Sequence, residues 1–233
     1  YRPRDAANLG YGVMISYELR VVHPMASDHT LQQILHADQS IRPGGLSVRL
    51  ATLEELPALL ELEACCQSEI LSSTEATLRE RIRAHPAGQL VAASSDGTLL
   101  GAAYTQRVAS CEVLLASQRA NELALHLPDG PVVQLLGIVQ LPDARVGDVL
   151  RKYVLQAAHL DSTVERVCSI ARCCAYVPSG SAAGGAAYRA HVRAGTDPGL
   201  LFHTLAGGRI GELVAGYRPR DAANLGYGVM ISY

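Results

Sequence analysis

The chain has 233 residues, of which 48% are hydrophobic, and a chain of this size can bury one large core. Its 20 Lys and Arg residues nearly balance 22 Asp and Glu residues, and the formal net charge of -2 argues against a nucleic-acid or anionic-membrane partner. Apolar runs are shorter than the roughly 18 residues of a membrane span, and the N-terminus lacks signal-peptide features, so we expect a soluble cytoplasmic protein.

The chain contains an internal repeat. Residues 1–17 are identical to residues 217–233, without the divergence expected of a natural structural repeat. We interpret residues 1–24 as an added second copy of the C-terminal segment, residues 25–45 as a linker and residues 46–233 as one domain. Both copies alternate as a strand does, so they compete for one place in a sheet, and the first copy would fill that place in another molecule.

The first half of the domain is predicted to mix helices with an antiparallel hairpin. Thr52 and Glu55 have the spacing of a capping box, which predicts a helix start. Asp96-Gly97 is a turn pair that accepts positive φ. The predicted elements are a strand over residues 46–50, a helix from 52 to about 65, a helix opened by Ser72 and ended by Pro86, strands over 89–94 and 98–107, and a candidate helix over 113–125.

The centre of the domain is predicted to be a strand, a tight loop and a helix. A largely apolar run, Val132–Val139, is typical of a buried strand, and apolar residues recur at helical spacing over Val149–Ala158. A parallel strand over residues 164–173 would complete a right-handed crossover. The remaining elements are a loop over 175–196 with a short helix near Tyr188, a helical stretch over 197–207 and a terminal strand.

The loop before this helix is a candidate cradle for coenzyme A (CoA). Unpaired N–H groups and the helix dipole make a helix N-terminus favourable for an anion such as a diphosphate. The candidate cofactor-binding residues are Val139, Arg145, Val146, Gly147 and Asp148. The same order of elements is also common scaffolding in α/β proteins, and Asp148 is more typical of a helix start than of a ligand.

Cysteine and histidine patterns favour neither a disulfide framework nor a metal site. The six cysteines lack CxxC spacing, and the eight histidines include no HExxH motif. We therefore expect reduced, mostly buried thiols and no bound metal.

Several motifs carry a resemblance to a known family. The chain reads DPGLLFHTLAGGRIGELVAGYRPRDAANLGYGV near its C-terminus, and similarity extends to LELEAC near Cys65, YTQR at Tyr104–Arg107 and VVQLLGI at Val132–Ile138. These motifs, over residues 46–233, resemble the GNAT-like domains of polyketide synthase loading modules. The resemblance implies the GCN5-related N-acetyltransferase (GNAT) fold of the α/β (α+β) class, with a mixed sheet, splayed parallel central strands and helices on both faces.

The resemblance also implies an enzyme that uses CoA thioesters. Such a domain decarboxylates malonyl-CoA or methylmalonyl-CoA and loads the short acyl group onto an acyl carrier protein, beside the other polyketide synthase domains. In the family a His and a Thr carry the decarboxylation, and an Arg and a Trp line the pocket. His203 matches the family His through its DP-x-x-x-FH setting, and Arg218 matches the Arg through Tyr-Arg-Pro.

The sequence departs from the family at the other two positions. Cys66 stands where the family has Trp, and Ala171 stands where the family has the Thr of a Thr-Arg-Cys motif. Ser169 lies two residues earlier on the predicted strand and points to the same face, so it is a candidate for a substitute role. When CO₂ leaves, the thioester becomes an enolate, whose oxygen needs fixed hydrogen-bond donors. The new carbanion-like carbon then needs a proton, and an imidazole can supply one near neutral pH.

Two other functions stay open. A degenerate GNAT fold with a structural or interaction role in a polyketide synthase would explain the missing Trp and Thr. A CoA-dependent N-acetyltransferase acting on an amine is the third possibility, although no acidic residue is clearly placed as its base. We favour the decarboxylase because His203 and Arg218 are both present.

Overall fold

The structure, a computed structural model, describes residues 45–65, 72–178 and 184–233. The added segment predicted at residues 1–24, the linker up to residue 44 and Cys66 lie outside these ranges. No helix in the described ranges is both long enough and apolar enough to cross a bilayer.

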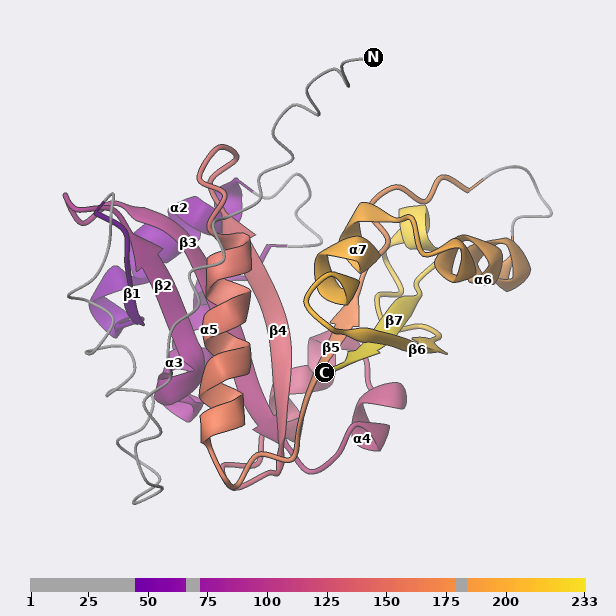
Figure 1. Cartoon of the computed structure of the whole chain (residues 1–233), viewed down its shortest axis with the longest axis horizontal. Coiled ribbons are helices and arrows are strands. Elements are labelled where there is room, and N and C mark those ends of the chain that lie inside the picture. Colours follow the sequence, from indigo (N-terminus) through magenta and orange to yellow (C-terminus); the bar gives the residue numbers. More distant parts are fainter. Residues whose placement is uncertain (1–44, 66–71, 179–183) are drawn as a thin grey trace, which may run out of the picture.

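One seven-stranded sheet runs through the molecule in the order β1-β2-β3-β4-β5-β7-β6 (Figure 1). Its central strands β4 (Val132–Gln140) and β5 (Arg166–Ala171) are parallel, and all other neighbouring pairs are antiparallel. The other strands are β1 (Ser47–Leu50), β2 (Gln89–Ala93), β3 (Leu99–Val108), β6 (Arg209–Val214) and β7 (Gly228–Ser232). The predicted mixed sheet with a parallel central pair is confirmed.

Helices cover both faces of this sheet. Helices α5 (Gly147–Leu160), α6 (Gly185–Ala194) and α7 (Pro198–Thr204) cover one face, which we call the α5 face; Figure 1 shows α5 and α7 in front of the sheet. The opposite face carries α2 (Leu56–Ala64), α3 (Glu75–Ala84) and α4 (Glu112–Leu115), and short 3-10 turns lie at Leu53–Glu55, Pro86–Gly88, Arg119–Leu125 and Ala222–Asn224.

Most of the predicted helix starts and turns are confirmed. The Thr52 N–H donates to the Glu55 carboxylate at 2.9 Å, as the capping box predicts. Helix α3 is capped two residues later than expected, because the Thr74 hydroxyl, not Ser72, accepts from the Thr77 N–H at 3.2 Å. Gly97 has φ of 88° in the turn between β2 and β3, a left-handed conformation that glycine adopts without steric strain.

Two predictions about elements were wrong. The helix expected over residues 113–125 is a single turn of α4 followed by a 3-10 segment, Arg119–Leu125, in which Glu122 accepts hydrogen bonds from Gln106 and Gln134 of the sheet. Strand β6 was not predicted at all. It is an edge strand with half of its residues exposed, and its sequence lacks the alternation that marks a half-buried strand.

The cysteine prediction was also wrong for one pair. Cys111, just before α4, and Cys168, on β5, form a disulfide on the face opposite α5. The two residues are 57 positions apart, so local spacing could not reveal the pairing. Among the described cysteines, Cys65, Cys173 and Cys174 are free thiols.

The parallel pair opens part of the way along its length. Strands β4 and β5 pair only as far as Leu135 and Ser169, whereas β4 continues to Gln140. The register between β3 and β4 shifts at this level, leaving Leu136 as an extra, bulged residue that bends β4. Since α5 begins shortly after β4 ends, the opening lies beside the N-terminus of α5.

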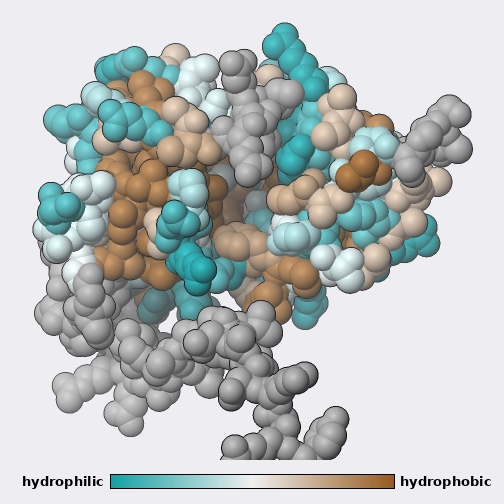
Figure 2. Space-filling view, turned by 90° about the horizontal axis from the view of Figure 1, so that it is seen from above, coloured by the Kyte–Doolittle hydropathy of each residue, from teal (hydrophilic) through white to brown (hydrophobic). Residues whose placement is uncertain are grey.

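Two apolar cores lie side by side on the α5 face. The core beneath α5 includes Val167 of β5, and the core beneath α6 and α7 includes Ala171 of the same strand. Ser169 lies between them on this face, and Tyr233 packs against both cores. Seen from above, apolar residues gather on the half that holds α5 and β1 to β4, and polar residues are more interspersed on the other half (Figure 2).

Candidate active site

His203 lies on the inward side of α7. The helix begins after Asp197, whose carboxylate accepts from the Gly199 N–H at 2.8 Å and so fixes the first turn. This start turns Leu200 and His203, one turn apart, toward the sheet, and His203 is only 8% exposed. A capped helix, rather than a loop, therefore sets the position of the imidazole.

The His203 ring is held by Tyr233, the residue after β7. Nδ1 of His203 lies 2.6 Å from the Tyr233 hydroxyl, and the Tyr233 backbone N–H donates to the Val167 carbonyl at 2.9 Å. Burial and the nearby charge of Arg151 lower the pKa of His203 to about 4. Burial raises the pKa of Tyr233 to about 12. The imidazole is therefore neutral at pH 7. The sequence led us to expect an imidazole that titrates near neutral pH, and the structure differs in this respect.

Ser169 lies at the point where the two parallel strands separate. Its hydroxyl donates to the Leu135 carbonyl at 3.0 Å, and Leu135 is the last residue of β4 that pairs with β5. The side chain is buried on the α5 face, as its spacing from Ala171 predicted. Its proton is engaged with the strand, so a substitute role in chemistry requires the hydroxyl to turn away from Leu135.

Arg151 is a buried cation that the sequence reasoning missed. Its guanidinium carbon lies 4.0 Å from the centroid of the Phe202 ring, and Nη2 donates to the Asp148 carboxylate at 2.7 Å. The residue is 4% exposed. The signal was present in the spacing Gly147, Arg151, Val154, Ala158, in which an arginine occupies a position of the inward stripe of α5.

We call the boundary between the two cores the seam, and we define it by Ser169, Arg151, His203 and Tyr233. It is lined by residues from β5, α5, α7 and the C-terminus, which are far apart in the sequence. A side chain added at Gly147 would lie 3.7 Å from the Phe202 ring, so α7 comes close to the start of α5. The seam therefore adjoins the opening between β4 and β5.

The candidate CoA loop lies directly before α5, as predicted, but one of its backbone amides already bonds to a side chain of the protein. Arg145 is exposed with φ of 49°, Val146 is buried, and the Gly147 N–H donates to Gln140 Oε1 at 2.7 Å. The Asp148 side chain is 65% exposed and pairs with Arg151. Val139 packs on the α2 side of the sheet, so only its backbone can face the opening. One amide of the cradle is thus already bonded within the protein.

Arg218 lies on the other side of the sheet from His203. It follows Tyr217, which packs with Leu114 of α4, and its guanidinium carbon lies 5.6 Å from the Tyr217 ring centroid. Burial and the positive charge of Arg119 lower the pKa of Arg218. Its surroundings also contain Glu122, a buried carboxylate that accepts hydrogen bonds from Tyr217, Gln134 and Arg119. The structure therefore does not place His203 and Arg218 side by side.

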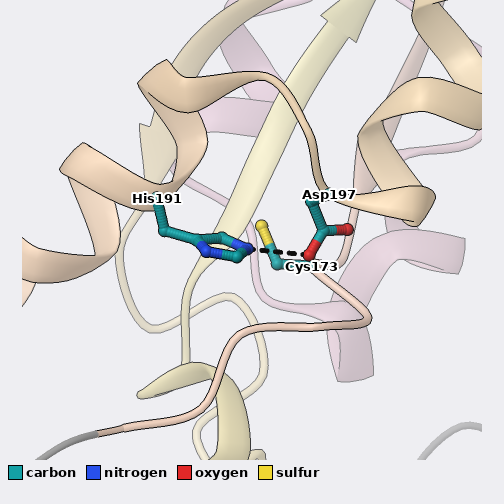
Figure 3. Close-up of side chains that lie close together, drawn as sticks. All are labelled: Cys173, His191 and Asp197. Carbon is teal, nitrogen blue, oxygen red and sulfur yellow. Dashed lines mark hydrogen bonds and ion pairs between the residues drawn. The ribbon is translucent and has the colours of Figure 1, made fainter.

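A second polar cluster on the α5 face joins Cys173, His191 and Asp197 (Figure 3). Their ligand atoms lie within 4.8 Å of one another, the distance range of a metal site. Asp197 Oδ1 accepts from the amides of Cys174 and Gly199, and Oδ2 accepts from the Ala175 amide and lies 2.8 Å from His191 Nε2. Since each oxygen already holds two partners and burial raises the pKa of the Cys173 thiol to about 11, the cluster is a structural node.

The arrangement of the sheet and the site assigns the protein to a structural class. A mixed sheet whose parallel central strands open beside a bulge, followed at once by a helix N-terminus, is the GNAT fold. Ard1 from Thermoplasma volcanium shares this fold, with a TM-score of 0.51 at 12% identity over 81% of this chain and 97% of that one.

Two solved structures are more similar. The GphF GNAT-like decarboxylase in complex with isobutyryl-CoA is 37% identical over 80% of this chain and 97% of that chain, with a TM-score of 0.73. The loading GNATL domain of CurA from Lyngbya majuscula is 34% identical over 81% and 96%, also with a TM-score of 0.73. No protein-family model and no curated protein matches the chain.

The chain belongs to the family of GNAT-like decarboxylase domains found in polyketide synthase loading modules. The predicted family and the predicted fold are both confirmed. This family includes a decarboxylase solved in complex with isobutyryl-CoA, so an acyl-CoA-using enzyme is the class of this protein.

Proposed function

We propose that the domain decarboxylates malonyl-CoA or methylmalonyl-CoA and transfers the product acyl group to the thiol of an acyl carrier protein. The observation that carries the proposal is the placement of a buried His203, oriented by Tyr233, beside the opening between β4 and β5. The 37% identity to a GNAT-like decarboxylase supports the same reaction class.

The reaction needs a donor for the charge that develops on the thioester. When CO₂ leaves, the electron pair of the broken C–C bond moves into a thioester enolate, whose carbon then takes a proton from water. If the Tyr233 hydroxyl donates to Nδ1, the single proton of the neutral His203 ring is on Nε2. The ring then acts as a fixed hydrogen-bond donor to the enolate oxygen, as in an oxyanion hole.

CoA would enter at the start of α5. We assign its diphosphate to Arg145, Val146, Gly147 and Asp148 and its pantetheine to the free edge of β4 at Val139. The Gly147 N–H would exchange Gln140 for a phosphate oxygen. Arg218 would approach from the other face through the opening, where a half-buried cation favours a carboxylate.

Mass spectrometry of the purified domain tests the proposal. The domain is incubated with malonyl-CoA and with methylmalonyl-CoA, with and without a carrier protein, and separately with amines. We expect loss of CO₂ and a carrier protein heavier by an acyl group, and His203→Ala should abolish both. Intact substrates with wild type would contradict the proposal, and acetylated amines would favour an N-acetyltransferase.

A non-catalytic scaffold is the second candidate, favoured by Ala171 at the position of the family Thr. Ala171 is 7% exposed on the α5 face, next in line to Ser169 on that face. Ala171→Thr restores a hydroxyl there. If the wild type is a weak decarboxylase, this variant should be faster, whereas a scaffold should stay inactive in both forms.

A further inference from the structure

Arg151 has more hydrogen-bond donors than the protein uses. Of its three guanidinium nitrogens, Nη2 bonds to Asp148, while Nε and Nη1 are buried and have no hydrogen-bond partner among the described residues. A buried N–H group of a charged side chain that bonds to nothing destabilises the fold. A fold that retains such donors has them available for a ligand.

The surroundings of the guanidinium point to the seam. One face of it lies over the Phe202 ring, and Phe202 directly precedes His203 on α7. The positive charge of Arg151 acts on both His203 and Tyr233, because its contribution lowers the pKa of each group. Asp148, its carboxylate partner, is 65% exposed. The inner end therefore presents positive charge and free N–H groups to the region of the imidazole.

We propose that Arg151 contacts the substrate: its unpartnered N–H groups donate to the thioester carbonyl oxygen of a bound acyl-CoA, beside His203. This rests on the proposed function. The same oxygen becomes negative in the enolate, so a cationic donor stabilises the transition state more than the ground state. Arg151 thereby supplies a donor in a chain that has Ala171 where its family has a threonine hydroxyl.

The diphosphate of CoA is the other acceptor that a guanidinium near the start of α5 could bind. The burial of Arg151 argues against a contact with the diphosphate. Arg145, in the loop before α5, and Asp148, in the first turn of α5, are exposed, whereas Arg151 is only 4% exposed. The experiment below separates the two acceptors.

The test compares two ligands that differ by one oxygen atom. Isobutyryl-CoA is a thioester, and S-isobutyl-CoA is the matching thioether, in which a CH₂ group replaces the carbonyl. Calorimetry gives the affinity of each ligand for wild type, Arg151→Met and Arg151→Lys. The matched control is Lys152→Met, which removes an exposed cation from the next position of the same helix.

We expect wild type and Lys152→Met to prefer the thioester by about tenfold or more, the contribution of one hydrogen bond from a charged donor. Arg151→Met should lose this preference, and Arg151→Lys should keep part of it. Equal weakening of both ligands in Arg151→Met would place the contact on the phosphates and overturn the inference, as would an unchanged preference.

The two proposals can fail separately in these measurements. If wild type binds both ligands but releases no CO₂ from malonyl-CoA, the proposed decarboxylation is wrong, and the thioester preference still decides the role of Arg151. If wild type releases CO₂ and Arg151→Met keeps the thioester preference, only the inference about Arg151 is wrong. If wild type binds neither ligand, both are wrong. Should Arg151→Met not fold, Arg151→Lys decides alone.

Discussion

Two buried charges on the α5 face differ in how completely the protein bonds them. Asp197 receives three backbone amides and an imidazole, two partners on each oxygen. Arg151 is buried to a similar degree, yet two of its three nitrogens have no partner among the described residues. Fully bonded charges hold a fold together, whereas donors left open in a buried place are available for a ligand. This difference separates the structural node from the seam.

Removing the carboxylate of Asp197 should have the largest effect on stability. Asp197→Ala leaves three amides and His191 without their acceptor and removes the cap of α7, so we expect about 3 kcal/mol less free energy of unfolding. Urea denaturation measures it. The exposed Asp143→Ala should change stability by less than about 0.5 kcal/mol. Similar small losses for both variants would show that the node does not hold α7.

The seam should make the protein sensitive to mild acid. The pKa of His203 is lower in the folded state, about 4, than its unfolded value near 6.5, so the unfolded state binds more protons between these values. The free energy of unfolding should therefore fall by about 2 kcal/mol between about pH 7 and pH 5 on account of this residue. Denaturation of His203→Gln at both pH values isolates the contribution.

His85 complicates that measurement, because burial and then His126 and Arg107 also lower its pKa to about 4. Wild type should therefore lose stability through both histidines, and His203→Gln only through His85. An identical pH dependence in the two proteins would show that the His203 imidazole is not held neutral in the seam.

Removing the Tyr233 hydroxyl should affect activity more than stability. Tyr233→Phe keeps the ring between the two cores but loses the bond to His203 Nδ1, so we expect about 1 kcal/mol less stability. The decarboxylation rate should fall about tenfold or more, since the ring and its tautomer are no longer fixed. Rates and urea denaturation of the same preparation check both; a loss of stability without a loss of rate would contradict the role of Tyr233.

Ser169→Ala should have the smallest effect. The hydroxyl bonds to the Leu135 carbonyl, and its removal should lower the free energy of unfolding by about 1 kcal/mol. The rate should change by less than about threefold if the hydroxyl only holds the strands together. A fall of about 10² or more would instead assign Ser169 the task of the missing threonine.

Local patterns in the sequence predicted the scaffold well. The largely apolar run Val132–Val139 and the helical spacing after it predicted β4 and α5, and the Phe202-His203 motif led to the family and to the seam histidine. The edge strand Arg209–Val214 was missed, because exposed strands carry no apolar alternation.

The seam itself could not be predicted from local patterns. Arg151, His203 and Tyr233 come from three separate segments, and only the packing of α7 near the start of α5 brings them together. The same holds for the disulfide between Cys111 and Cys168. Arg218 was grouped with His203 through the family motif, and the structure places it on the other face, a separation that no spacing in the sequence expresses.

The most direct test of the central claim is the release of labelled CO₂ from malonyl-CoA carrying the label in its free carboxylate. Wild type and the control Lys152→Met should release label at the same rate, and His203→Ala should be at least about 10²-fold slower while still unfolding in a single cooperative urea transition near neutral pH. Equal rates for His203→Ala and wild type would contradict the assignment of the chemistry to the seam.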